Sequence, residues 1–268
     1  MPNTIYSNFY LSNEIEDQYN SRLNLLRFAT VDNSLVGAPG MIRKINVYSA
    51  TDGVEKLEMG KGNTKSIEVS FAPKEYKITL AQGRFEYYDE ELMTDPTAIQ
   101  TGINHIAVDM FNTVNADVYA ELMKATLTAS AGTPGFDAFV DAAALIPTEN
   151  VEGQNLFAIL APSDMAAVRK ALKDTLQYNE SYARTGYVGS VAGIDLYAKK
   201  DATAGTIVVA DRKAVTVFNK KGTEVEQSLR GSRSAEDANI RKNSIYGRKY
   251  YLAALTDATR AVKLTIGG

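Results

Sequence analysis

The chain has 268 residues, of which 45% are hydrophobic and 23% charged, as in ordinary globular proteins of one large or two modest domains. Its 29 Lys and Arg against 32 Asp and Glu give a net charge of −3, whereas proteins that neutralise duplex phosphates usually carry a basic excess. The absence of cysteine and the single histidine exclude disulfides, thiolate chemistry and multi-histidine metal sites. No apolar run approaches the roughly 20 residues of a membrane-spanning helix. The N-terminus shows no signal peptide, so we expect synthesis and assembly in the cytosol.

The first 36 residues begin with an aromatic-rich stretch that includes Tyr6, Phe9 and Tyr10. After it, apolar residues recur every three or four positions to about Phe28, which predicts a helix with one apolar face. Such a helix needs a surface on which to lie.

Alternating apolar and polar residues follow the chain-breaking Gly37-Ala38-Pro39-Gly40. They predict strands, with a turn at residues 72–74 and a polar, glycine-bearing tip between Ser49 and Lys65. The predicted strands are 45–47, 67–71, 76–80 and 85–87. We interpret this part as a long β excursion.

A long helix is predicted next, because Asp95-Pro96 pairs an N-cap residue with a proline at the first helical position. A single apolar stripe runs from Ile99 to Leu122, interrupted in its second turn by Gly102. We expect this helix to span about residues 96–127, roughly 45 Å, as the spine of the molecule.

The second half predicts further short elements and a mobile polar loop at 174–185. Helices are expected at 136–144 and 162–173, strands at 155–160, 194–198, 206–210 and 214–218, and a hairpin turn at 220–222. Alternating stretches return between Glu224 and Ile266. The overall class is α+β, with strands near both ends and helices between them.

Neither of the two features that resemble catalytic motifs favours an enzyme. The glycine-rich stretch 186–193 leads into a predicted strand and not a helix, so it fits a tight connection between strands better than a phosphate cradle. His105 lies within the long helix, and no Gly-x-Ser-x-Gly elbow accompanies it. We expect it to be packed or hydrogen-bonded there.

Two charged clusters leave alternatives open. The acidic residues Asp89, Glu90, Glu91 and Asp95 could bind a metal or act as acid and base, but a solvated or salt-bridged segment before a helix is the favoured interpretation. The basic cluster could touch DNA, or pair with acidic groups of a neighbouring subunit, which we favour because the chain is acidic overall. Its members are Arg230, Arg233, Arg241, Lys242, Arg248 and Lys249.

Several stretches in this order resemble the Hong Kong 97 type major capsid proteins of tailed phages. They are the β excursion from Ile42 to Leu80, "EELMTDP" before the spine helix, "NLFAILAPSDMAAVRKAL", "TGYVGSVAGIDLYAKK" and "IVVADRKAVTVFNKKGTEVEQSLR". The resemblance covers most of the chain. It implies a shell protein that is not an enzyme and that requires no cofactor or metal.

The resemblance also implies a division of the chain. We expect an N-terminal arm at 1–36, an extended loop with flanking strands at 37–84, a peripheral domain with the spine helix at 85–133, an axial domain at 134–228, and strands returning to the peripheral domain at 229–268. Some family members crosslink a Lys to an Asn, and Lys56, Lys61 and Lys65 lie in the loop. Nothing in the sequence assigns that chemistry here.

The implied function is an icosahedral shell of pentamers and hexamers around phage double-stranded DNA, which the shell contacts only weakly and non-specifically. Scaffolding and portal proteins are the implied partners, with no membrane, and assembly in the host bacterial cytoplasm yields a virion capsid. The expected assembly contacts are Tyr6, Phe9, Tyr10, Lys56, Glu58, Lys61, Lys65, Arg230, Arg233 and Arg248. An encapsulin-like nanocompartment shell that holds protein cargo is the alternative, and a carboxylate-based hydrolase is the remote one.

Overall fold

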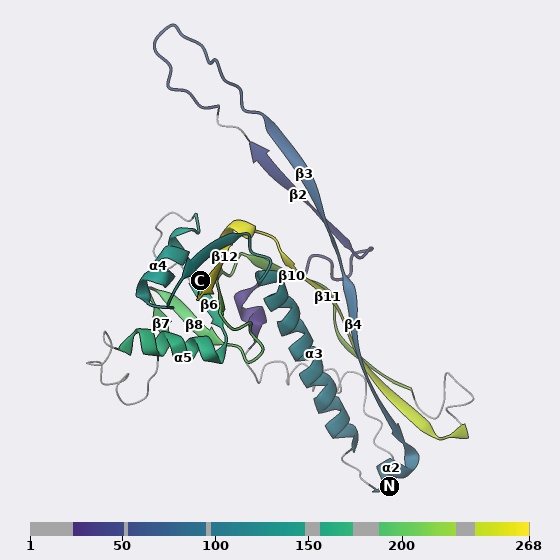
Figure 1. The fold of residues 1–268 in the computed structure, drawn as a ribbon. Helices are drawn as coiled ribbons and strands as arrows, with labels where there is room; N and C mark the ends of the chain where they lie inside the picture. Colours follow the sequence, from purple (N-terminus) through teal and green to yellow (C-terminus); the bar gives the residue numbers. More distant parts are fainter. Residues whose placement is uncertain are drawn as a thin grey trace.

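The computed structural model describes residues 24–50, 53–94, 98–147, 156–173, 188–228 and 239–267. It has a body of two β-sheets and a long helix, and a β-hairpin projects far from this body (Figure 1). None of the helices in these ranges is long and apolar enough to cross a membrane. Most of the predicted arm and all of the predicted polar loop at 174–185 lie outside the described residues.

The projecting hairpin consists of β2 (Ile42–Ala50) and β3 (Val69–Lys77), which pair only with each other. The register runs from Ile42 opposite Lys77 to Ala50 opposite Val69. The predicted turn at 72–74 is wrong, because Pro73 lies inside β3, opposite Asn46. A two-stranded ribbon leaves one edge of each strand without a ladder, and such an edge tolerates a proline.

A four-stranded sheet forms one half of the body, in the order β1 (Thr30–Asp32), β10 (Val215–Ser228), β11 (Lys242–Leu255) and β4 (Thr79–Tyr88). β4 continues directly from the hairpin. The turn predicted at 220–222 is wrong, because β10 passes through it with a register shift between Asn219 and Glu224. The extra residues form a bulge, from which the side chain of Lys220 reaches the backbone carbonyls of Leu35 and Ala38.

The long helix α3 (Ala98–Leu122) packs against β4 and β11, after the short helix α2 (Asp89–Thr94). Its 25 residues span about 37 Å, shorter than predicted. The chain leaves the helix after Leu122 because Leu127–Ala131 forms strand β5, paired in parallel with β12. Tertiary pairing there overrides the helical pattern of the sequence.

A six-stranded sheet forms the other half of the body. Its order is β5 (Leu127–Ala131), β12 (Ala261–Ile266), β9 (Thr206–Asp211), β6 (Leu156–Leu160), β8 (Ile194–Ala198) and β7 (Ser190–Val191). Helices α4 (Phe136–Ala144) and α5 (Pro162–Ala171) agree with the predicted ones. The glycine-rich stretch is a strand connection as expected, since Ala192 and Gly193, both with positive φ, join β7 to β8.

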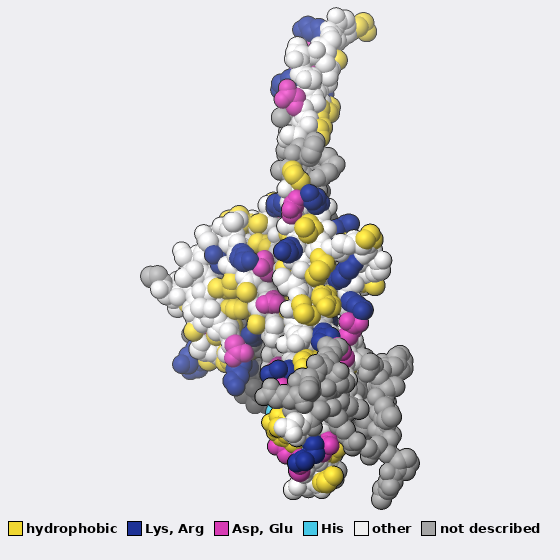
Figure 2. All heavy atoms as spheres, turned by 90° about the vertical axis from the view of Figure 1, so that its right-hand side faces the viewer, with side chains coloured by type: hydrophobic (Ala, Val, Ile, Leu, Met, Phe, Trp, Pro, Cys, Tyr) yellow, Lys and Arg dark blue, Asp and Glu magenta, His cyan; other side chains and the backbone are white. Residues whose placement is uncertain are grey.

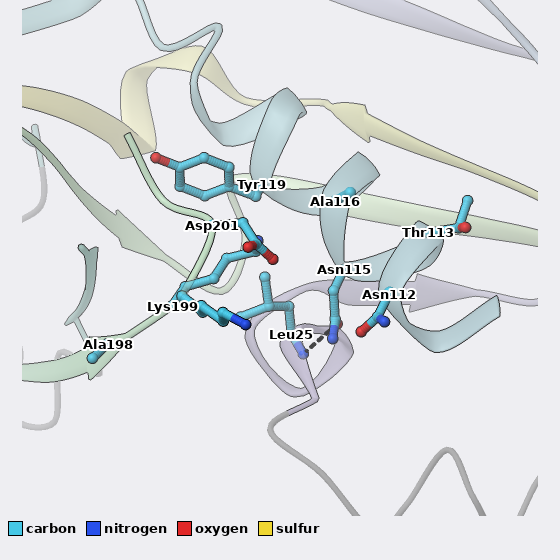
Figure 3. Close-up of a pocket in the computed structure, with 10 residues that line it drawn as sticks. Leu25, Asn112, Thr113, Asn115, Ala116, Tyr119, Ala198, Lys199 and Asp201 are labelled. Carbon is cyan, nitrogen blue, oxygen red and sulfur yellow. Dashed lines mark hydrogen bonds and ion pairs between the residues drawn. The ribbon is translucent and has the colours of Figure 1, made fainter. Parts of the chain in front are cut away.

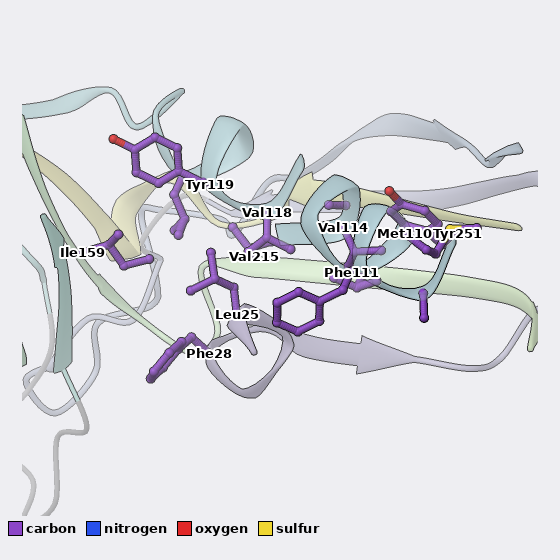
Figure 4. Packing of buried hydrophobic residues seen from close by; sticks show 14 of the residues in the cluster. Leu25, Phe28, Met110, Phe111, Val114, Val118, Tyr119, Ile159, Val215 and Tyr251 are labelled. Carbon is purple, nitrogen blue, oxygen red and sulfur yellow. The ribbon is translucent and has the colours of Figure 1, made fainter. Parts of the chain in front are cut away.

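Each of the two sheets combines strands that are far apart in the sequence. Strands β5 and β12 come from outside 134–228 and yet belong to the six-stranded sheet, while β10 leaves that segment for the four-stranded one. One core cluster connects the two sheets, with Leu25, Phe28, Val118 and Ile159 among its members (Figure 4). Leu25 and Phe28 belong to a short 3-10 helix, η1 (Leu25–Phe28), at the end of the predicted N-terminal helix.

Candidate assembly surfaces

The tip of the hairpin has a defined shape although it lies far from the body. Glu55 accepts two hydrogen bonds from Thr64, one from its backbone N–H and one from its hydroxyl, both of 2.8 Å. These bonds hold the pKa of the Glu55 carboxyl below its usual value. Gly53 also allows a close approach, because a Cβ there would lie 2.6 Å from the side chain of Ile67.

Apolar side chains of the tip are exposed to solvent, including Val54 (90%), Met59 (104%), Leu57 and Ile67. Figure 2 shows hydrophobic side chains interleaved with charged ones along this projection. The nominated contact residues Lys56, Glu58, Lys61 and Lys65 are all exposed here. The first three line an open hollow of about 440 Å³, and Lys61 pairs with Glu58 at 2.9 Å.

The root of the hairpin is fixed by the bulge in β10. The Lys220 ammonium donates to the carbonyl of Leu35 at 3.1 Å and to that of Ala38, and so holds the turn that leads into β2. Beside it, the Asn219 amide donates to Asn33 Oδ1 at 3.0 Å. The hairpin therefore leaves the body in a set direction.

The start of the described chain is anchored on the spine helix. Leu25 N donates to Asn115 Oδ1 at 3.0 Å, and Asn115 is buried. The Phe28 ring packs against Phe157 and Tyr197, with centroids 4.7 and 4.6 Å away. The three nominated aromatics of the arm, Tyr6, Phe9 and Tyr10, lie outside the described residues.

A polar pocket of about 770 Å³ lies between α3 and the loop after β8 (Figure 3). Lys199 Nζ is 5.3 Å from the centroid of the Tyr119 ring, and the Tyr119 hydroxyl accepts a hydrogen bond from Thr203 N at 2.9 Å. These contacts connect the spine helix to the six-stranded sheet. They give Lys199 and Tyr119 structural roles in this pocket.

Three members of the basic cluster have acidic partners in their own chain, whereas the sequence favoured pairs with a neighbouring subunit. Arg248 pairs with Glu226 and donates from Nε to Gln82 at 2.8 Å. Lys242 pairs with Glu86 at 2.8 Å, and Arg241 pairs with Glu90. The nominated Arg230 and Arg233 lie outside the described residues.

The described part of the acidic cluster, residues 89–91, is salt-bridged and hydrogen-bonded as expected, and Asp95 lies outside the described residues. Asp89 accepts a hydrogen bond from Asn243 of β11, and Glu90 pairs with Arg241, the residue before that strand. Glu91 accepts a hydrogen bond from Tyr88 N at 3.1 Å. In the part of the chain that the structure describes, no group of acidic or histidine side chains could hold a metal ion. His105 is exposed on α3, so the expectation that it would be packed is wrong.

Sequence reasoning missed the Glu55–Thr64 contact and the Lys220 contact. No local pattern reveals either one, because each joins residues that only the fold brings together. The bulge at Lys220 was visible only as a Lys-Lys-Gly run, which predicts a turn equally well.

The chain is similar to known proteins over nearly its whole length, although no family model matches it. The major capsid protein of Staphylococcus phage phiMR11 is 27% identical over 265 residues, which cover 94% of this chain and 90% of that protein.

Solved structures agree. A chain from Gordonia phage Cozz superposes with a TM-score of 0.68 at 14% identity, covering 92% of this chain and 89% of its own. The capsid of a native GTA particle superposes with a TM-score of 0.67 at 14% identity, covering 91% of this chain and 90% of its own. A virus-like particle from Pyrococcus furiosus superposes with a TM-score of 0.59 at 14% identity, covering 95% of this chain and 97% of its own.

The chain therefore has the fold of these capsid and particle chains. More particularly, the chain is a homologue of a phage major capsid protein, and phage capsids are among its structural neighbours, as the Hong Kong 97 type resemblance implied.

Proposed function

We propose that copies of this chain form the pentamers and hexamers of an icosahedral shell that encloses phage double-stranded DNA. The observation that carries this proposal is the projecting hairpin. Among the described residues its two strands pair with no strand except each other, and its tip exposes apolar side chains such as Val54 and Met59.

A two-stranded hairpin is at best marginally stable in water unless it packs on another surface. The described body offers no such surface beyond the root, where Ile78 is buried against Phe218 and Ala254. Exposed apolar groups in a soluble protein mark partner surfaces. The hairpin is therefore the extended loop of the family, and it gains its missing contacts from an adjacent copy.

The remaining parts follow from the same assignment. Residues before Leu25 form an arm that serves neighbouring copies, with Tyr6, Phe9 and Tyr10 as contacts. The body contains the peripheral part, built from α3 and the four-stranded sheet, and the axial part, built from the six-stranded sheet. Since β5 and β12 belong to the latter sheet, the axial part takes in both strands from outside 134–228.

DNA contact is weak and non-specific in this proposal. The net charge is −3, and Arg241, Lys242 and Arg248 already have acidic partners in their own chain. Duplex binding by phosphate neutralisation needs cations that are not already paired. Scaffolding and portal proteins complete the assembly in the host cytoplasm, and the mature location is the virion capsid.

Electron microscopy of particles from cells that express the chain with its scaffold tests this function. We expect closed icosahedral shells, and shells from infected cells should contain DNA. An encapsulin-like shell, which the comparisons do not favour, would contain protein instead. A soluble monomer under every assembly condition would refute the proposal.

The hairpin assignment needs a variant of its own. Replacing residues 53–66 with a short Asn-Gly turn should leave the body folded, because no core cluster draws on this tip. The shortened chain should fail to form shells. Normal shells from it would refute the role of the hairpin.

A further inference from the structure

Two helices cover the same face of the six-stranded sheet. α4 buries Phe139 and Ala142, while α5 buries Met165 and Val168, and these four side chains belong to one core cluster with the sheet. Residues of the opposite face, such as Phe157, belong to the other cluster. The outer sides of the two helices therefore point away from the same layer.

The helices lie toward opposite ends of that layer. α4 packs on β5 and β12, the first two strands in the sheet order. α5 follows β6, and its Val168 belongs to the same core cluster as Val191 of β7 and Ile194 of β8, the last strands in that order (Figure 1). A neighbour at one end of the sheet would thus meet α4, and a neighbour at the other end would meet α5.

The outer side of α4 is acidic and apolar. Asp137 and Asp141 are exposed one turn apart, next to Phe136 (53% exposed) and Val140 (42%). The helix contains no basic residue. Neither aspartate forms a salt bridge within the described residues.

The outer side of α5 is basic. Lys170 of α5 and Lys173, two residues past the end of the helix, are exposed, and Arg169 is exposed beside Lys170. The one acidic residue of this helix, Asp164, is buried and accepts a hydrogen bond from Gly205 N at 3.0 Å. It therefore does not neutralise the lysines at the surface.

We propose that the outer side of α4 in one copy docks on the outer side of α5 in the next copy around a capsomer ring. This inference rests on the proposed shell function. A ring built from one chain needs two different, complementary surfaces at opposite ends of the subunit. Aspartates opposite lysines supply complementary charge. Phe136 and Val140, which are exposed in one copy, lie under the lysine stems at the centre of the contact.

Charge reversal tests the contact. Asp137→Lys with Asp141→Lys gives a chain basic on both helices, and Lys170→Glu with Lys173→Glu gives a chain acidic on both. Either double variant should raise the threshold concentration for assembly by about tenfold or more, because like charges then meet across the ring. The quadruple variant, with both signs exchanged, should return to the threshold of the parent. A matched control is Arg212→Glu with Lys213→Glu on the exposed turn after β9, which should assemble like the parent.

Mixing the two double variants gives a second readout. Each contact in an alternating ring then joins opposite charges, so even-numbered rings should form. Odd-numbered rings must contain one like-charge contact, so pentamers and closed shells should stay scarce while hexameric arrays accumulate.

The outcomes are distinguishable. If the parent chain forms no shells, the proposed function fails. If the parent forms shells and either double variant assembles normally, or the quadruple variant does not recover, the α4–α5 contact is wrong. Circular dichroism checks that each variant is folded, as expected for substitutions at exposed positions.

Discussion

Gly102 of the spine helix lies directly beneath the ring of Phe85 in β4. A Cβ at Gly102 would stand 2.4 to 2.6 Å from three carbons of that ring, closer than any real side-chain contact. The missing side chain lets α3 approach the sheet at this point. At Gly83 the glycine is in the strand β4 and the side chain is in the helix, because a Cβ at Gly83 would lie 3.3 Å from Ile106 of α3.

Gly102→Ala should therefore destabilise the protein, although the same change in an exposed helix interior stabilises by up to about 1 kcal/mol. Overpacking against Phe85 costs about 1–3 kcal/mol, which outweighs the gain in helix propensity. Chemical denaturation of the unassembled subunit measures the difference. Adding Phe85→Ala should reverse the sign of the Gly102→Ala effect, and a stabilised single variant would contradict the close approach.

The spine helix shows which features of the fold the sequence alone predicts and which it does not. Its apolar stripe and the interruption at Gly102 were both visible, because a single helix face is a local pattern. Its end was not, because Leu127–Ala131 becomes a strand only by pairing with β12, more than a hundred residues later. The same limit explains Pro73 and Lys220, which look like turn residues but lie in strands whose partners are distant in sequence.

The candidate assembly surfaces also include features that the sequence predicted and features that it could not predict. The polar, glycine-bearing segment between Ser49 and Lys65 indicated a projection, and the nominated lysines are exposed on it. The partners of Arg248 could not be predicted, because Glu226 and Gln82 reach it only through the pairing of β10, β11 and β4.

Ile106→Pro should abolish folding. Residue 106 is in the interior of α3 and is buried against the sheet, so proline removes a helix hydrogen bond, clashes with the preceding turn and removes a core side chain. The bond and the clash alone cost about 3 kcal/mol or more. The measurement is the soluble yield and the circular dichroism of the variant. Ile106→Val, expected to cost only about 0.5–1.5 kcal/mol, is the control. Normal shells from the proline variant would contradict a continuous spine.

Glu55→Ala should loosen the tip of the hairpin without affecting the body. The change removes the acceptor for both Thr64 donors, so amide hydrogen exchange at Thr64 should become faster. Glu58→Ala in the same tip loses only an exposed pair with Lys61 and should leave Thr64 protected. Equal protection of the Thr64 amide in the parent and in Glu55→Ala would show that the two Glu55–Thr64 hydrogen bonds do not hold the tip.

The same two hydrogen bonds make the order of the hairpin tip depend on pH. The two Thr64 donors lower the pKa of Glu55 below its ordinary value of 4.5, so its contribution to the tip is complete above that pH and is lost as the pH falls through the lower folded-state value. The tip should therefore be intact at neutral pH and open only in acid. An NMR titration of the Thr64 amide follows the change, and a midpoint at or above 4.5 would refute it.

Lys220→Met should destabilise the root of the hairpin. Methionine retains the apolar stem but leaves the carbonyls of Leu35 and Ala38 without the ammonium donor. The loss is expected to be about 1–3 kcal/mol in the free energy of unfolding of the subunit. Lys221→Met, next to it on the exposed side and paired with Glu224, should change stability by less than about 1 kcal/mol. Equal effects of the two substitutions would show that the carbonyl contacts of Lys220 contribute little.

Deletion of residues 1–12 should leave a folded, soluble subunit that assembles poorly. The described chain is already anchored by Leu25 on Asn115 and by Phe28 in the core, and both lie after the deletion. Substituting serine for Tyr6, Phe9 and Tyr10 keeps the length and removes only the aromatic groups, so it should reproduce the defect if those side chains contact neighbouring copies. Light scattering during assembly compares the variants with the parent. Since a contact between copies changes the assembly threshold and not the melting temperature of the subunit, normal shells from the truncated chain, or a lowered melting temperature, would contradict the arm assignment.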